Sequence, residues 1–167
     1  MKEQTEANMK AAFAGESQAH MKYMNFSDKA DREGKPNIAR LFKAVSFAEK
    51  IHASSHLKAL GQIGATEENL KAALAGETYE VNEMYPAFLK AAQEEGEKVA
   101  GRSMDWALAS EKTHAALYDT AIKAAGKGED MAVGVISVCG VCGYTVEGEP
   151  PDKCPVCGAL KNKFVGF

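Results

Sequence analysis

Most of the chain alternates apolar and polar residues with the period of an α-helix. From residue 3 to about residue 125 the sequence is rich in Ala, Glu, Lys, Met and Leu and contains few Gly or Pro residues. The pattern predicts helices over residues 3–32, 37–62, 77–95 and 97–125. Gly34 and Pro36 separate the first two helices, and Gly96 separates the last two.

The lengths of the connections predict how these helices are arranged. The first and third connections are short, and short connections favour antiparallel hairpins. The second connection contains Gly61, Gly64 and a short helix start at Thr66, and it is long enough to run the length of a bundle. We therefore expect a mainly α protein built on a crossover four-helix bundle.

The C-terminal part of the chain has a different composition. Residues 126–137 lose the helical period, and the residues beyond them are dominated by Cys, Gly, Pro and Val. We expect one domain over residues 1–130 and a small β-rich domain over residues 131–167, with 131–137 as linker or first strand. A domain this small buries little hydrophobic core and needs disulfide bonds or a bound metal ion to be stable.

Glutamates interrupt the apolar stripes of the helices. Glu16 shares its stripe with Ala12 and Tyr23, and Glu49 follows Val45 on the stripe of the next helix. The acids and histidines on these inward stripes are Glu16, Glu49, His52, Glu80, Glu83, Glu111 and His114. Burying one unpaired carboxylate costs several kcal/mol. Five of them together require compensating cations, so the sequence predicts a metal site.

The spacing of these residues supports two metal ions. Glu-x-x-His occurs twice, as Glu49/His52 and Glu111/His114, and residues three apart lie on one face of a helix. A single such pair is usually a surface pair, but mid-helix carboxylates on four helices match the di-iron or di-manganese carboxylate bundles. Glu16 precedes the first motif by 33 residues (49 − 16) and Glu80 precedes the second by 31 (111 − 80), which suggests two equivalent helix hairpins.

Tyrosines and further histidines lie near these ligands in the sequence. Tyr23 and Tyr118 each follow a ligand glutamate by seven residues, so they are either hydrogen-bond donors to the ligands or ordinary core tyrosines. His20 and His56 fall outside the repeated pattern, and we assign them no metal. Pro86 follows Glu83 and removes a backbone hydrogen bond, so we expect a kink there.

The four cysteines form a second candidate metal site. They occur as two Cys-x-x-Cys pairs, Cys139/Cys142 and Cys154/Cys157. In a reducing compartment this pattern indicates a metal tetrathiolate rather than disulfides. Tetrahedral sulfur coordination suits either a structural zinc or a redox-active iron. The neighbouring di-metal site favours iron, because a redox centre needs an electron donor, with zinc possible by substitution.

Composition excludes several classes of partner. The chain has 46% hydrophobic and 26% charged residues, a net charge of −3 and a pI near 5.8. There is no basic excess to bind nucleic acid. The N-terminal residues contain no signal-type apolar stretch, and no apolar run is long enough to cross a bilayer. We expect no membrane association and a cytoplasmic location.

Taken together, these motifs resemble the rubrerythrin family over essentially the whole chain. The segments that carry the resemblance are Phe13–Ala19, Ala48–His52, Gly76–Pro86, Ala109–His114 and the two cysteine pairs. The resemblance implies a ferritin-like di-iron domain followed by a rubredoxin-like domain. It also implies a non-haem peroxidase that reduces hydrogen peroxide to water, with electrons from NAD(P)H delivered through partner reductases and rubredoxin.

The resemblance also gives the candidate residues their roles. Two irons would be held by Glu16, Glu49, His52, Glu80, Glu83, Glu111 and His114, and a third by Cys139, Cys142, Cys154 and Cys157. We expect Glu83, His52 and Tyr23 to take part in catalysis, with one iron exchanging His52 for Glu83 on oxidation. The family is typically a homodimer in which the cysteine domain of one chain faces the bundle of the other, with electron transfer between subunits.

Two other functions fit the same residues. The bundle resembles ferritins, which oxidise and store iron, although a closed cysteine domain argues against a storage shell. Alternatively, the chain is a binding or structural protein with zinc in place of iron. Colour separates this alternative from the first, because a ferric tetrathiolate is red and its zinc counterpart is colourless.

Overall fold

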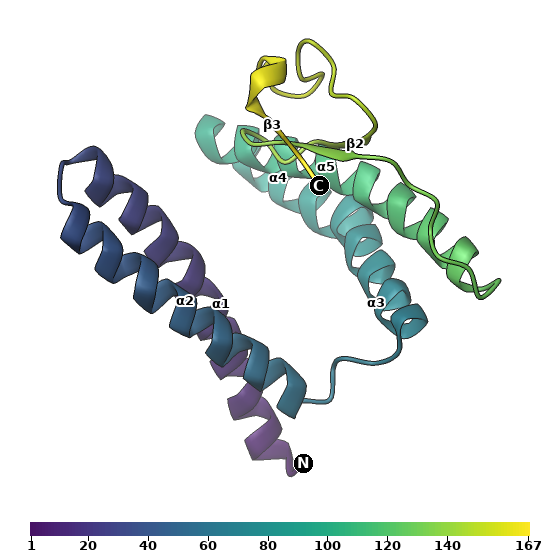
Figure 1. The fold of residues 1–167 in the computed structure, drawn as a ribbon, viewed down its shortest axis with the longest axis horizontal. Coiled ribbons are helices and arrows are strands. Elements are labelled where there is room, and N and C mark those ends of the chain that lie inside the picture. Colours follow the sequence, from purple (N-terminus) through teal and green to yellow (C-terminus); the bar gives the residue numbers. More distant parts are fainter. The chain divides into compact units, whose positions relative to one another are not determined.

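The computed structural model describes residues 1–167 and divides them into two compact units, Met1–Gly64 and Ala65–Phe167 (Figure 1). The first unit contains two α-helices. The second contains the remaining helices and a small sheet that includes the cysteines. The predicted class, mainly α followed by a small β-rich module, is confirmed.

The first unit is an antiparallel hairpin of α1 (Glu3–Arg32) and α2 (Pro36–Ala59). Gly34 adopts a φ of 71° after α1, and Pro36 occupies the first turn of α2, where its missing N–H costs nothing. Ser46 donates a hydrogen bond to the His20 carbonyl oxygen at 2.9 Å. Ser46 is fully buried, so the two helices approach each other closely at this point.

The second unit begins with α3 (Thr66–Tyr79), and here the expectation that the third helix begins at residue 77 is wrong. The Glu68 carboxylate accepts a hydrogen bond from the Ala65 backbone N–H at 2.8 Å, which helps to start the helix. Gly76 lies inside the helix, because one interior glycine costs only about 1 kcal/mol. The connection between α2 and α3 is therefore shorter than the sequence suggested.

The rest of the helical part consists of the π-helix η1 (Glu80–Met84), α4 (Tyr85–Glu94) and α5 (Lys98–Ala125). The Tyr85 N–H donates to the Glu80 carbonyl oxygen, five residues back, as a π-turn requires. Pro86 has no N–H to restore the ordinary hydrogen-bond ladder. The distortion expected beside Glu83 therefore takes the form of a widened turn.

The cysteine module is a three-stranded antiparallel sheet of β1 (Ile136–Cys139), β2 (Thr145–Glu147) and β3 (Phe164–Gly166), in the order β2-β1-β3. A short 3₁₀ helix, Lys161–Lys163, leads into β3. Val138 pairs with Thr145, and Cys139 pairs with Phe164. This sheet packs on α5, where the Ser110 hydroxyl shares its one proton between the Trp106 carbonyl oxygen at 3.0 Å and the Cys142 carbonyl oxygen of the module at 3.2 Å.

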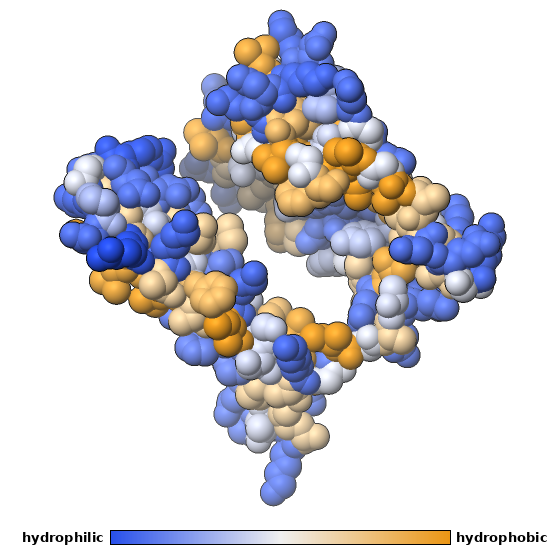
Figure 2. Space-filling model, in the orientation of Figure 1, coloured by the Kyte–Doolittle hydropathy of each residue, from blue (hydrophilic) through white to orange (hydrophobic).

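Large apolar side chains remain on the surface of both units, as Figure 2 shows in orange. Leu41 and Phe47 are each 62% exposed in the first unit, and Val99 is 73% exposed in the second. Buried positions are held mostly by small residues such as Ala39 and Ala53. None of the helices has the combination of length and apolarity that crossing a bilayer requires.

Candidate metal centres

Glu16, Glu49 and His52 form a cluster on the α1–α2 hairpin. His52 Nδ1 lies 2.9 Å from Glu49 Oε2 and 3.9 Å from Glu16 Oε1. The three possible ligand atoms lie within 4.8 Å of one another. The structure therefore brings together three of the predicted ligands, one from α1 and two from α2.

The second unit contains a cluster with the same geometry. His114 Nδ1 lies 2.6 Å from Glu111 Oε2, and it lies 3.9 Å from Glu77 Oε2. In each cluster a histidine faces the glutamate three residues before it and a second glutamate on a different helix. Each hairpin thus contributes one carboxylate–histidine cluster, but the carboxylate beside Glu111 and His114 is Glu77 and not Glu80, which the sequence repeat had suggested.

The third member of the second cluster, Glu77, is a residue that the sequence reasoning missed. Its Oε2 atom is buried and has no hydrogen-bond partner. Burial raises the pKa of Glu77 to about 7, with a further contribution from Glu111. The spacing contained a signal, because Glu77 precedes Glu111 by 34 residues (111 − 77), closer to the 33 of the first hairpin than the 31 of Glu80.

Glu80 and Glu83 lie one turn further on, in the π-helix. Burial raises the pKa of Glu80, and the negative charge of Glu111 raises it further, whereas His114 lowers it. Glu80 therefore interacts electrostatically with the second cluster. Neither Glu80 nor Glu83 belongs to the tight clusters, and the roles of both as ligands stay predictions.

Tyrosines near the clusters differ in their surroundings. The Tyr23 ring packs against Phe26 and Phe42, with ring centroids 6.1 and 6.2 Å away, and its hydroxyl makes no hydrogen bond. Tyr85 responds to the carboxylates, since burial, followed by the charge of Glu111, raises its pKa. Tyr118 lines a pocket of about 440 Å³ beside Glu77 and His114. The roles expected for Tyr23 and Tyr118 stay predictions.

The four cysteines lie together, and none forms a disulfide. Cys139 Sγ is 3.7 Å from Cys157 Sγ, and Cys142 Sγ is 3.5 Å from Cys154 Sγ. These separations match the edge of a sulfur tetrahedron, ~3.8 Å for metal–sulfur bonds of about 2.3 Å. Burial opposes ionisation of Cys154, yet the backbone amides of Cys157 and Val156 lower its pKa to about 7.

The donor atoms of these clusters fit bound cations. In each carboxylate–histidine cluster, Nδ1 and the carboxylate oxygens converge without any donor side chain such as Lys or Arg among them. The unpartnered Oε2 atom of Glu77 is a buried acceptor in need of a positive charge. Oxygen and imidazole ligands suit iron or manganese, and thiolates suit iron or zinc.

The chain has two hairpins with matching carboxylate–histidine clusters, and a tetrathiol module follows them. These features place it in the class of di-metal carboxylate proteins that also have a site of four cysteines. Comparison with known proteins gives the family. The sequence model of the rubrerythrin family matches residues 7–122, and that of the rubrerythrin rubredoxin-like domain matches residues 138–165. The chain therefore belongs to the rubrerythrin family, and it has the residues of the di-iron carboxylate site and of the four-cysteine site.

Individual relatives match over nearly their whole length. Rubrerythrin-2 of Clostridium acetobutylicum is 38% identical over 95% of this chain and 94% of its own. Nigerythrin of Nitratidesulfovibrio vulgaris is 35% identical over 96% of this chain and 85% of its own. A structure of nigerythrin in a partially reduced state aligns with a TM-score of 0.56, covering 98% of this chain and 86% of the other.

Proposed function

We propose that this protein is a non-haem di-iron peroxidase that reduces hydrogen peroxide to water. The observation that carries the proposal is the pair of matching clusters, in which His52 and His114 each turn Nδ1 toward a glutamate three residues before it. A redox reaction that consumes two electrons suits a protein with two equivalent metal-binding clusters. The two irons would be held by the seven glutamate and histidine residues named from the sequence, with Glu77 beside them.

Bound iron would supply the electrons of the reaction, one from each of two ferrous ions, so that hydrogen peroxide, two electrons and two protons become two water molecules. The protein side chains would bind the ions through Nδ1 and carboxylate oxygens. The pocket of about 440 Å³ beside Glu77 and His114 has room for a molecule as small as peroxide.

The cysteine module would return electrons to the di-iron centre. A tetrathiolate iron cycles between ferrous and ferric states, whereas zinc has no redox chemistry. Electrons would reach the module from rubredoxin and an NAD(P)H-dependent reductase. We further propose a cytoplasmic homodimer in which the module of one chain serves the di-iron centre of the other.

The first experiment is a visible spectrum of protein loaded with iron under anaerobic conditions and then oxidised. A ferric tetrathiolate gives an intense red colour. The reduced protein is then mixed rapidly with hydrogen peroxide or with dissolved oxygen, and the growth of the red colour is followed. We expect peroxide to oxidise the protein much faster than oxygen does. Faster reaction with oxygen, accompanied by uptake of added ferrous iron, would instead favour an iron-storing protein.

A further inference from the structure

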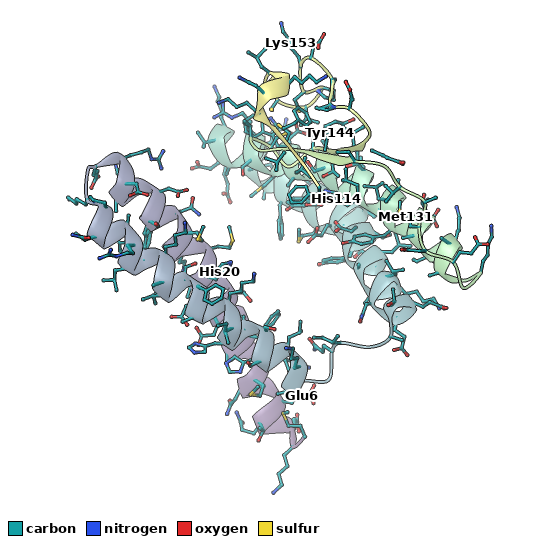
Figure 3. The ribbon with its side chains drawn as sticks, in the orientation of Figure 1. Glu6, His20, His114, Met131, Tyr144 and Lys153 are labelled. Atoms are coloured by element: carbon teal, nitrogen blue, oxygen red, sulfur yellow. The ribbon has the colours of Figure 1, made fainter.

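A partly buried polar contact joins the cysteine module to the second carboxylate–histidine cluster. His114 and Ser110 lie one turn apart on α5, and both contact the module. His114 Nε2 lies 2.8 Å from Thr145 Oγ1 at the start of β2. Ser110 is 2% exposed and Thr145 is 6% exposed, whereas the His114 side chain is 28% exposed, so the module side of the contact is buried. Figure 3 shows His114 between α5 and the strands of the module.

The protons of this contact can be placed by counting donors. The Thr145 hydroxyl has one proton, and it donates that proton to the Gly143 carbonyl oxygen at 2.9 Å. When that bond to Gly143 is made, Thr145 Oγ1 is an acceptor for His114 Nε2–H, and this is the tautomer that a metal ion at Nδ1 requires. In the neutral ring the proton on Nε2 leaves Nδ1 with a free lone pair, which points toward Glu111 and Glu77.

We infer that Thr145 is a positioning residue for the metal cluster of Glu77, Glu111 and His114. Its hydroxyl holds the His114 ring in the tautomer and orientation that present Nδ1 to a metal ion. Such partners of a histidine ligand fix its ring and strengthen metal binding. This inference rests on the proposal that the cluster binds metal. It means that the cysteine module helps to build the cluster beside it.

The first cluster has no such anchor. His52 Nδ1 faces Glu49 at 2.9 Å, as His114 Nδ1 faces Glu111, but within its own unit His52 Nε2 has no hydrogen-bond partner, and the side chain is 55% exposed. The two histidines therefore occupy the same position in the Glu-x-x-His motif, but only the His114 ring is held by a hydrogen bond at Nε2. Thr145 makes His114 the fixed ligand, and His52 is left free to change its coordination.

Cobalt binding tests the role of Thr145 without relying on activity. The cysteine site is first filled with one equivalent of Zn²⁺, which such sites bind more tightly than Co²⁺. Co²⁺ is then titrated into the glutamate and histidine sites and followed by its visible absorption. We expect Thr145→Val to weaken the binding of one Co²⁺ per chain by about tenfold or more. Thr145→Ser keeps the hydroxyl and should restore wild-type binding.

Ser137→Ala is the matched control. Ser137 is 2% exposed, and its hydroxyl donates to the Gly148 carbonyl oxygen at 2.8 Å within the same module, away from α5. Loss of this hydrogen bond should destabilise the module without changing Co²⁺ binding. If valine at position 145 prevents folding, Thr145→Ala makes the same prediction with a smaller side chain.

The His114 ring provides a second measurement. In the zinc-loaded protein, nitrogen NMR of the imidazole should show a slowly exchanging Nε2–H in the wild type and in Thr145→Ser, and rapid exchange in Thr145→Val. Unchanged cobalt affinity together with an unchanged ring signal in Thr145→Val would overturn the inference. Failure of the wild type to bind Co²⁺ would contradict the proposed function instead, and the ring signal would still decide whether Thr145 anchors His114.

Discussion

His114 Nδ1 lies 2.6 Å from Glu111 Oε2, three residues earlier on α5. In the tautomer we infer, with His114 Nε2–H donated to Thr145, Nδ1 has no proton of its own to donate. Two acceptors at this distance repel each other unless a proton or a metal ion lies between them. The metal-free cluster combines this contact with a buried carboxylate that has no hydrogen-bond partner, Glu77, so the stability of the metal-free protein should depend on pH.

Glu77 gives this sensitivity a direction. Its pKa in the folded protein is about 7, because of burial and Glu111, whereas the ordinary value is 4.5. Between these values the folded state binds more protons than the unfolded state, so stability falls as pH rises through this window. Denaturant unfolding of the metal-free protein should therefore show a lower free energy of unfolding at pH 8 than at pH 5. Glu77→Gln should reduce this difference.

A surface substitution on the same helix serves as control. Glu67→Gln changes an exposed residue on α3, and in this variant the free energy of unfolding should depend on pH as it does in the wild type. Metal bound at the cluster should also stabilise the protein at pH 8, since the ion replaces the proton as the neutralising charge. If metal-free and metal-loaded proteins unfold identically at pH 8, the buried-ligand assignment is wrong.

Glu83 should be needed for the turnover of peroxide more than for the binding of iron. Two ferrous ions carry a charge that the four carboxylates of the two clusters, Glu16, Glu49, Glu77 and Glu111, already balance, so a further carboxylate gains importance when the irons become ferric. A harder cation favours oxygen over imidazole nitrogen, and the unanchored His52 is the ligand best able to leave. Glu83→Ala should therefore keep both irons and slow peroxide turnover by about tenfold or more.

Two measurements check the Glu83 prediction. Iron content and peroxidase rate are compared with those of Glu94→Ala, an exposed substitution on α4 that should behave as the wild type. Crystals of the reduced and oxidised protein should show His52 bound in the first state and Glu83 in the second. Wild-type turnover in Glu83→Ala with both irons present would contradict the exchange.

Much of the fold follows from local sequence, and the exceptions have physical causes. The α1–α2 hairpin was predicted because Gly34 and Pro36 act within a few residues of the helix ends. The start of α3 was missed because Gly76 looked like a boundary, although a glycine inside a helix costs little. The sequence predicted a kink near Pro86 but not a π-helix, since that depends on which carbonyl oxygen receives the Tyr85 N–H.

In the candidate sites too, features set by residues close in sequence were predicted, and features set by packing between distant segments were not. The Glu-x-x-His motifs and the cysteine pairs were found because their members are close in sequence. Glu77 was missed because its proximity to His114 depends on how α3 packs against α5. The contact between His114 and Thr145 joins residues 31 apart (145 − 114), and no periodicity in the sequence reports it.

The cysteine site should be separable from the glutamate and histidine sites, because the clusters share no ligand. Replacing Cys154 and Cys157 by serine should abolish the red colour and remove one iron per chain. With excess iron present, the remaining clusters should stay occupied. Metal analysis and visible absorption of the same sample check both points. Loss of all iron from the variant would show that the sites depend on one another for occupancy.

Gly140 should be required for closure of the cysteine module. Its N–H donates to the Lys163 carbonyl oxygen at 2.9 Å, and a Cβ atom at position 140 would lie only 2.9 Å from that oxygen. Gly140→Ala must therefore push apart the ends of β1 and β3, at a cost of about 1–3 kcal/mol. The red colour of the ferric module should bleach at a lower temperature than in the wild type. Gly134→Ala, where the added methyl group meets open space, is the control and should bleach close to the wild-type temperature. Equal bleaching temperatures for the two variants would mean that the contact between Gly140 and Lys163 does not limit the stability of the module.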